Sequence, residues 1–146
     1  MKLTSRSPDD TVSIGFRLGK LLKAGDVVGL YGDLGAGKTT MVKGIAGAFG
    51  IDARDVTSAS FTIIAGYESS PPFYHIDLYR IHGSEDVDNT GLWECTGGRS
   101  VSVVEWAEKL GDEYAKDIIR VTLADRGETE REITIEGIDE KDWNNL

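Results

Sequence analysis

The stretch VVGLYGDLGAGKTTMVKGIAGAFG, residues 27–50, decides the expected fold. It begins with a short, nearly all-apolar run (27–32), which is typical of a strand buried on both faces of a parallel sheet. A glycine-rich turn follows, and the run from residue 38 has the pattern of an amphipathic helix that ends at Gly50. Strand, glycine-rich turn and helix in this order predict an α/β domain with a phosphate-binding loop.

The turn itself, GDLGAGKT at residues 32–39, matches the phosphate-loop pattern G-x-x-x-x-G-K-[ST] at every fixed position. Its glycines let backbone N–H groups turn toward a phosphate, and the following helix start adds partial positive charge. Lys38 can reach the β- and γ-phosphate oxygens, and the Thr39 hydroxyl is placed for Mg²⁺. An accidental match in a glycine-rich turn is disfavoured by the flanking strand and helix. The predicted nucleotide-binding residues of this segment are Gly32, Asp33, Leu34, Gly35, Ala36, Gly37, Lys38, Thr39 and Thr40.

The remaining chain supplies the other elements of such a domain. A helix capped by Ser7 or Asp9 is expected to stop at Gly25. Residues 139–146 are expected to be a frayed end, with a docking tail as the alternative. Further elements are expected as strands at 60–69, 73–81 and 100–106, an acidic helix at 84–95 capped by Ser84, and a hairpin at 117–137 that turns around Arg126 and Gly127. The order predicts one P-loop NTPase-like domain over residues 1–146, with a mostly parallel sheet flanked by helices and a C-terminal antiparallel hairpin.

A phosphate site of this kind also needs an acid near the magnesium, usually at the end of a neighbouring strand. Glu105 follows a mostly valine run and fits this role, although many proteins of this architecture use Asp there. Thr39 and Glu105 are therefore the predicted metal-site residues. The alternative is an ordinary acid at a strand end that faces solvent.

The segment YHIDLYR, residues 74–80, puts polar groups into a run that otherwise suits a core. Alternation along a strand places His75, Asp77 and Tyr79 on one face. A carboxylate there is costly unless it has a partner, and a nucleotide's Mg²⁺ and attacking water would give Asp77 one. A structural pair of Asp77 with Arg80 is the alternative, and His75 is read as structural. The predicted catalytic residues are Lys38, Asp77 and Glu105.

Composition narrows the classes of function. The net charge of −9 argues against a nucleic-acid groove of the chain's own, because affinity there comes mainly from Lys and Arg on phosphates. No apolar run approaches the length of a membrane span, and residues 1–10 lack a signal peptide's apolar region, so we expect a cytoplasmic protein without a membrane partner. The single cysteine, Cys95, fits a reducing compartment and is read as an inert residue, not a nucleophile.

The base bound by this site is expected to be adenine. A guanine-specific GTPase usually carries an N-K-x-D segment late in the chain, and AKDI and EKDW do not match it. Small-molecule kinases with phosphate loops generally need a lid and a substrate-binding insertion, for which this chain has little room. ATP and Mg²⁺ are therefore the expected cofactors.

Four segments together resemble the TsaE (YjeE) family, small bacterial ATPases needed to make threonylcarbamoyladenosine in tRNA. They are LYGDLGAGKTT, TSASFTI, YHIDLYR and SVVEWAEKL, in the family's order and at about its spacing. The resemblance implies that Lys38 binds phosphate, that Thr39 and Glu105 surround Mg²⁺, and that Asp77 belongs to a switch-like element. It also implies an accessory ATPase that acts on a TsaD–TsaB complex, so that tRNA is met only through these partners.

The resemblance is imperfect in another switch-like element, residues 58–62. Family members usually read S-P-T-[FY]-T there, whereas this chain has SASFT; Ser60 keeps a hydroxyl, and loss of the proline gives the unbound loop more freedom. Thr11 and Arg131 match an N-terminal Thr and a late Arg that approach the nucleotide in the family. Two other functions stay open: a small-molecule kinase, and a nucleotide-gated binding module with negligible turnover.

Overall fold

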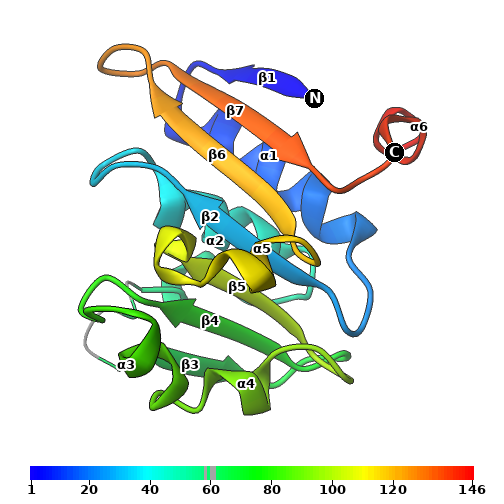
Figure 1. Cartoon of the computed structure of the whole chain (residues 1–146). Helices are drawn as coiled ribbons and strands as arrows, with labels where there is room; N and C mark the ends of the chain where they lie inside the picture. The colour runs from blue at the N-terminus through cyan, green and yellow to red at the C-terminus, as the bar shows by residue number, and fades with distance from the viewer. Residues whose placement is uncertain (58, 60–61) are drawn as a thin grey trace.

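The computed structural model describes residues 1–57, 59 and 62–146 and contains a seven-stranded sheet of order β1-β7-β6-β2-β5-β4-β3 (Figure 1). The four central strands, β6, β2, β5 and β4, are parallel, and antiparallel strands extend the sheet on both sides. The predicted fold class is confirmed, including the hairpin of β6 and β7. The strands are β1 (Lys2–Ser5), β2 (Val27–Tyr31), β3 (Ile64–Tyr67), β4 (Phe73–Asp77), β5 (Val101–Glu105), β6 (Ile119–Asp125) and β7 (Arg131–Glu136).

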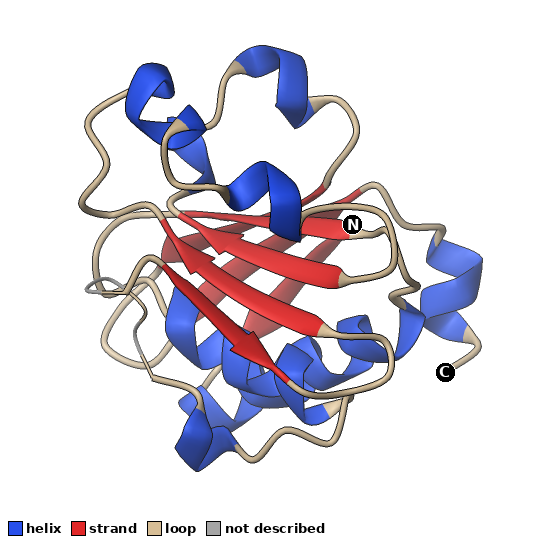
Figure 2. Cartoon of the chain, turned by 90° about the horizontal axis from the view of Figure 1, so that it is seen from below, coloured by secondary structure: helices blue, strands red, loops and turns tan. Residues whose placement is uncertain are grey.

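Helices cover both faces of the sheet (Figure 2). On one face, α1 and α2 pack over apolar side chains from every strand, whereas short helices cover the other face over β4 and β5. Alternation along the strands sends Val101 and Val103 to the first core and Val104 to the second. The helices are α1 (Pro8–Leu21), α2 (Lys38–Gly47), η1 (Ala53–Asp55), α3 (Ser84–Asp88), α4 (Leu92–Cys95), η2 (Ala107–Lys109), α5 (Asp112–Ala115) and α6 (Glu140–Asn144).

Glycines let α1 and α2 pack backbone to backbone. A Cβ added at Gly44 of α2 would lie 2.2 Å from the carbonyl oxygen of Val12, and one added at Gly15 of α1 would lie 2.6 Å from that of Met41. Real Cβ atoms essentially never come so close, so both positions require glycine. This contact fixes α2, and with it the loop that enters α2 from β2.

The carboxyl ends of the parallel strands β2, β4 and β5 meet at one edge of the sheet. The register pairs Asp77 at the end of β4 with Glu105 at the end of β5, and Glu105 with Leu30 near the end of β2. Ligands in open α/β sheets bind in the crevice outside these ends. In the described part of the chain, no helix combines the length and the apolar character needed to cross a membrane.

Two expected strands are shorter than predicted. β4 ends at Asp77 and not at Ile81, because the Asp77 carboxylate accepts a hydrogen bond from the Tyr79 N–H over 2.9 Å and closes a turn. Tyr79 therefore lies beyond the strand and not on its face. Of the run 60–69 only β3 is a strand, and residues 60 and 61 lie outside the described residues.

The expected helix 84–95 is split into α3 and α4. The intervening turn ends at Gly91, whose φ of 80° breaks the helical path, and the residue before α3 is Gly83, so the predicted cap at Ser84 is wrong. Of the two predicted caps of the first helix, Ser7 is the one observed, through a hydrogen bond from the Asp10 N–H. It ends at Leu21, four residues before Gly25.

The chain ends were not anticipated. β1 pairs with β7, although residues 2–5 show no strand signal of their own. The expected frayed C-terminus is a helix, α6, whose Trp143 is buried against α1. The Arg17 guanidinium lies 4.3 Å above the Trp143 ring and donates a hydrogen bond to the Trp143 carbonyl. The frayed-end prediction is wrong because this contact holds the C-terminal helix against α1. The contact joins residues 126 positions apart, so no local pattern predicts it.

Candidate active site

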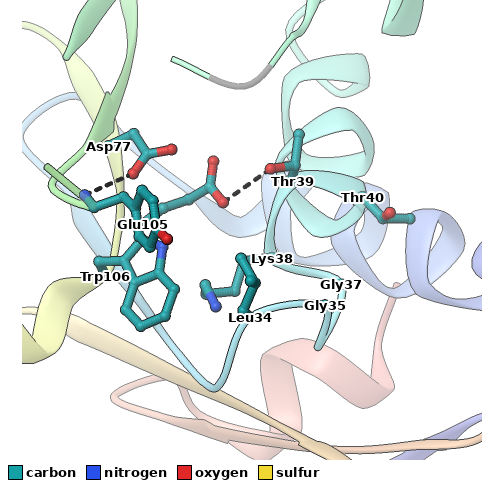
Figure 3. A pocket seen from close by; sticks show the side chains of 10 residues that line it. Leu34, Gly35, Gly37, Lys38, Thr39, Thr40, Asp77, Glu105 and Trp106 are labelled. Atoms are coloured by element: carbon teal, nitrogen blue, oxygen red, sulfur yellow. Dashed lines mark hydrogen bonds between the residues drawn. The ribbon is translucent and has the colours of Figure 1, made fainter. Parts of the chain in front are cut away.

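A cavity of about 390 Å³ lies at the carboxyl ends of β2, β4 and β5 (Figure 3). The predicted catalytic residues Lys38, Asp77 and Glu105 all line it, together with Thr39. These side chains come from the start of α2 and from two strand ends, segments that are far apart in the sequence. The other lining residues are Leu34, Gly35, Gly37, Thr40, Tyr79 and Trp106.

The loop between β2 and α2 adopts a conformation that only its glycines allow. Gly32, Gly35 and Gly37 have φ values of 147°, 81° and 100°. A Cβ at Gly32 would also lie 2.5 Å from the Leu123 carbonyl oxygen. The N–H groups at the start of α2 stay available for an anion, since Gly37 provides no side-chain cap. This geometry is suited to binding phosphate.

Lys38 is the cation of the cavity and is almost fully buried. Its ammonium donates hydrogen bonds to the carbonyl oxygens of Gly32 (2.5 Å) and Asp33 (2.8 Å) and lies 4.0 Å above the Trp106 ring. Burial lowers the pKa of Lys38, and the charges of Glu108 and Glu105 oppose this effect. A phosphate beside Lys38 would add the negative charge that a buried ammonium needs.

Glu105 is buried, and both of its carboxylate oxygens are engaged. Thr39 Oγ1 donates to Oε1 over 2.9 Å (Figure 3), and His75 Nε2 donates to Oε2 over 2.5 Å. The Thr39 hydroxyl directs its hydrogen toward Glu105, so its oxygen lone pairs can face a cation. Mg²⁺ prefers such oxygen ligands, and Thr39 with Glu105 beside it fits this metal.

Asp77 lies next to Glu105 and is also buried. Its backbone N–H donates to the carbonyl oxygen of Ile63 over 2.8 Å, and its carboxylate accepts from the Tyr79 N–H. Ile63 has a φ of 67°, an unusual value for a β-branched residue. The strained Ile63 directly follows the switch-like element 58–62, in which the predicted Ser60 lies outside the described residues.

A second cavity, of about 130 Å³, adjoins the loop and includes both family-derived candidates, Thr11 and Arg131, as well as Gly35 and Thr40. Arg131 donates hydrogen bonds to the carbonyl oxygens of Gly127 (2.7 Å) and Gly35 (3.3 Å), so it joins the β6–β7 hairpin to the loop. The Thr11 hydroxyl is buried and bonds that of Ser5 over 2.7 Å. The structure thus brings both candidates to the predicted loop, and nucleotide contact by them stays a prediction.

Comparison with known proteins agrees with this architecture. The model of a family described as "Threonylcarbamoyl adenosine biosynthesis protein TsaE" matches residues 5–133. This chain belongs to the TsaE family. It is 40% identical to the tRNA threonylcarbamoyladenosine biosynthesis protein TsaE of Treponema pallidum over 92% of this chain and 99% of that one. It is 37% identical to the TsaE of Bacillus subtilis, over 94% of this chain and 86% of that one.

A solved structure supports the same assignment. The crystal structure of Bacillus subtilis YdiB superposes with a TM-score of 0.73 at 36% sequence identity. The match covers 97% of this chain and 87% of YdiB. The fold is therefore shared along nearly all of this TsaE-family chain.

Sequence reasoning missed several residues of this TsaE-family site. Trp106, at a φ of 57°, lies over Lys38, and the ring of Tyr79 packs 5.3 Å from the Trp106 ring. Glu108 accepts a hydrogen bond from the Gly32 N–H over 2.9 Å and so anchors the start of the loop. The segment WAEK, residues 106–109, was a signal for Trp106 and Glu108, since it directly follows the predicted acid Glu105. His75 was read as structural, and its contact with Glu105 depends on a register that the sequence does not reveal.

Cys95 belongs to α4 and packs against the second core, on the other face of the sheet from Lys38, Asp77 and Glu105. Burial, and then the neighbouring Glu94 charge, raise the pKa of the Cys95 thiol. A nucleophilic cysteine needs the opposite shift.

Proposed function

We propose that this TsaE-family chain is a Mg²⁺-dependent ATPase that acts on a TsaD–TsaB complex during threonylcarbamoyladenosine modification of tRNA. The observation that carries the proposal is the convergence of Lys38, Thr39, Asp77 and Glu105 on one cavity beside a phosphate loop. A phosphate-binding group, a metal-site pair and an additional carboxylate are the parts that phosphoryl transfer to water requires.

The residues would divide the work as follows. Loop N–H groups and Lys38 bind the phosphates, and Thr39 with Glu105 holds Mg²⁺, which would neutralise charge on the γ-phosphoryl group. Both oxygens of Glu105 already accept hydrogen bonds from Thr39 and His75. The bond from Thr39 places Glu105 in the metal shell, and Asp77, which lines the same cavity, is proposed to orient the attacking water.

Adenosine is the proposed nucleoside because no guanine-reading N-K-x-D segment is present in the sequence. Thr11 and Arg131 are proposed to approach it from the second cavity. The acidic composition, with a net charge of −9, supports a role in which tRNA is held by the partner proteins. The TsaE names of the T. pallidum and B. subtilis relatives support the same pathway.

The first test is phosphate release from Mg·ATP by the purified chain, alone and then with TsaD and TsaB. We expect a low rate alone that rises with the partners. No rise on a complex that does bind would support a nucleotide-gated module instead, and failure to bind the partners would favour a small-molecule kinase.

Lys38→Ala provides the blank for that assay. Loss of a charge-assisted contact of roughly 3 kcal/mol should weaken ATP affinity by about 100-fold, as measured by calorimetry. Lys43→Ala is the matched control, because Lys43 belongs to the same helix but does not line the cavity. Unchanged ATP affinity in Lys38→Ala would sink the assignment of the loop.

A further inference from the structure

We propose that His75 is a positioning residue that holds the Glu105 carboxylate in the orientation needed at the Mg²⁺ site. The inference rests on the proposed function and adds a residue to it. His75 is fully buried in β4, and its Nε2 lies 2.5 Å from Glu105 Oε2. Since an ionised carboxylate only accepts hydrogen bonds, the His75 nitrogen is the donor.

The contact is built into the register of the sheet. His75 pairs with Val103, and Asp77 pairs with Glu105, so His75 and Glu105 are diagonal neighbours on the same face of β4 and β5. The other Glu105 oxygen accepts from Thr39 at the start of α2. A chain of hydrogen bonds therefore runs from His75 through Glu105 to Thr39 and ties two strands to the helix that begins at the loop.

The polar contacts of His75 point to this role. Its second nitrogen, Nδ1, is buried and has no hydrogen-bond partner among the residues that the structure describes. Burial of an unpaired polar atom destabilises a fold, and an apolar side chain would fill the position without this cost. Within the described chain, the one hydrogen bond of the ring goes to Glu105, so the benefit of a histidine here lies in holding that carboxylate.

Without His75, the Glu105 carboxylate would keep only the hydrogen bond from Thr39, so its orientation would be less constrained. Residues that hold the ligands of a metal typically change metal affinity or activity 10- to 100-fold when they are lost. We therefore expect His75 to act on Mg²⁺ through Glu105, without touching the nucleotide.

The test compares His75→Gln with His75→Met. The two substituted side chains have similar length, but the Gln amide nitrogen can donate to Glu105 and the Met thioether cannot. ATP affinity is measured by calorimetry with EDTA and then with Mg²⁺. We expect about a tenfold loss of the Mg²⁺-dependent gain in His75→Met, unchanged affinity in EDTA, and retention of most of the gain in His75→Gln.

Two results would overturn the inference: a full Mg²⁺-dependent gain in His75→Met, or equal loss in both variants. A wild-type chain that does not bind ATP would instead contradict the proposed function, which is a separate failure. In a Glu105→Gln background, His75→Met should cause no further loss.

If His75→Met does not fold, a measurement on the wild-type chain still tests the inference. Nitrogen-15 NMR of the histidine rings should show His75 protonated at Nε2, with a shifted signal in Glu105→Gln. A ring protonated only at Nδ1 would contradict the donation on which the inference depends.

Discussion

The two faces of the sheet are built differently. On the α1–α2 face, helices of 14 and 10 residues contact each other through glycines, and His75, Asp77 and Glu105 project from the strands toward this side. On the α3–α5 face, helices of 5, 4 and 4 residues leave an apolar cavity of about 280 Å³ beside Trp93 and Tyr114. Close packing therefore accompanies the polar groups whose positions determine the chemistry.

Among substitutions that compare the two faces, we expect the largest effect from removing a charge on the α1–α2 face. Asp77→Asn should lower phosphate release by about 100-fold or more, because an amide orients water less effectively than a carboxylate does. The amide oxygen still accepts from the Tyr79 N–H, so the melting temperature should stay nearly unchanged. A large drop in melting temperature, with normal release by the folded fraction, would favour the structural pairing of Asp77 with Arg80.

The packing of α1 against α2 is tested by a pair of alanine substitutions in α2. Gly44→Ala should lower the free energy of unfolding by about 3 kcal/mol, because its Cβ would collide with the Val12 backbone. Gly47→Ala is the control: its Cβ would meet only the Phe16 ring, at 3.5 Å, and should stabilise the helix by up to about 1 kcal/mol. Denaturant titration measures both. Similar values for the two variants would show that α1 and α2 adjust easily.

Substitutions on the α3–α5 face should have the smallest effect on ATP binding and stability. Trp93 stacks on Tyr114 with ring centroids 4.0 Å apart, and its indole N–H donates to Asp88. Trp93→Ala should lower the free energy of unfolding by about 2 kcal/mol without changing ATP affinity, and Trp93→Phe should recover part of that stability. A clear loss of ATP affinity in Trp93→Ala would mean that the two faces are coupled.

The sequence predicts the α1–α2 face well, because the sequence patterns that specify this face are local. The strand, the loop and α2 follow one another, and the glycines of the loop are required by its own backbone angles. The meeting of Asp77 with Glu105 is also predictable, since parallel strands place their carboxyl ends at one edge.

What the sequence does not predict depends on contacts between distant residues. β1 is a strand only because β7 pairs with it, and α6 is fixed by Trp143 on Arg17. The bond of His75 to Glu105 depends on the register of β4 against β5, which no local pattern specifies. The end of β4 was missed because a side chain–backbone hydrogen bond, not the apolar pattern, determines it.

The contacts of Lys38 have a consequence for affinity. Its ammonium already has two carbonyl partners and the Trp106 ring, so a phosphate that recruits it must displace at least part of this set. Nucleotide binding here is then an exchange of partners, and its free energy is the difference between two occupied arrangements. A substitution at Trp106 can thus alter affinity through the arrangement that is given up as much as through the one that is formed.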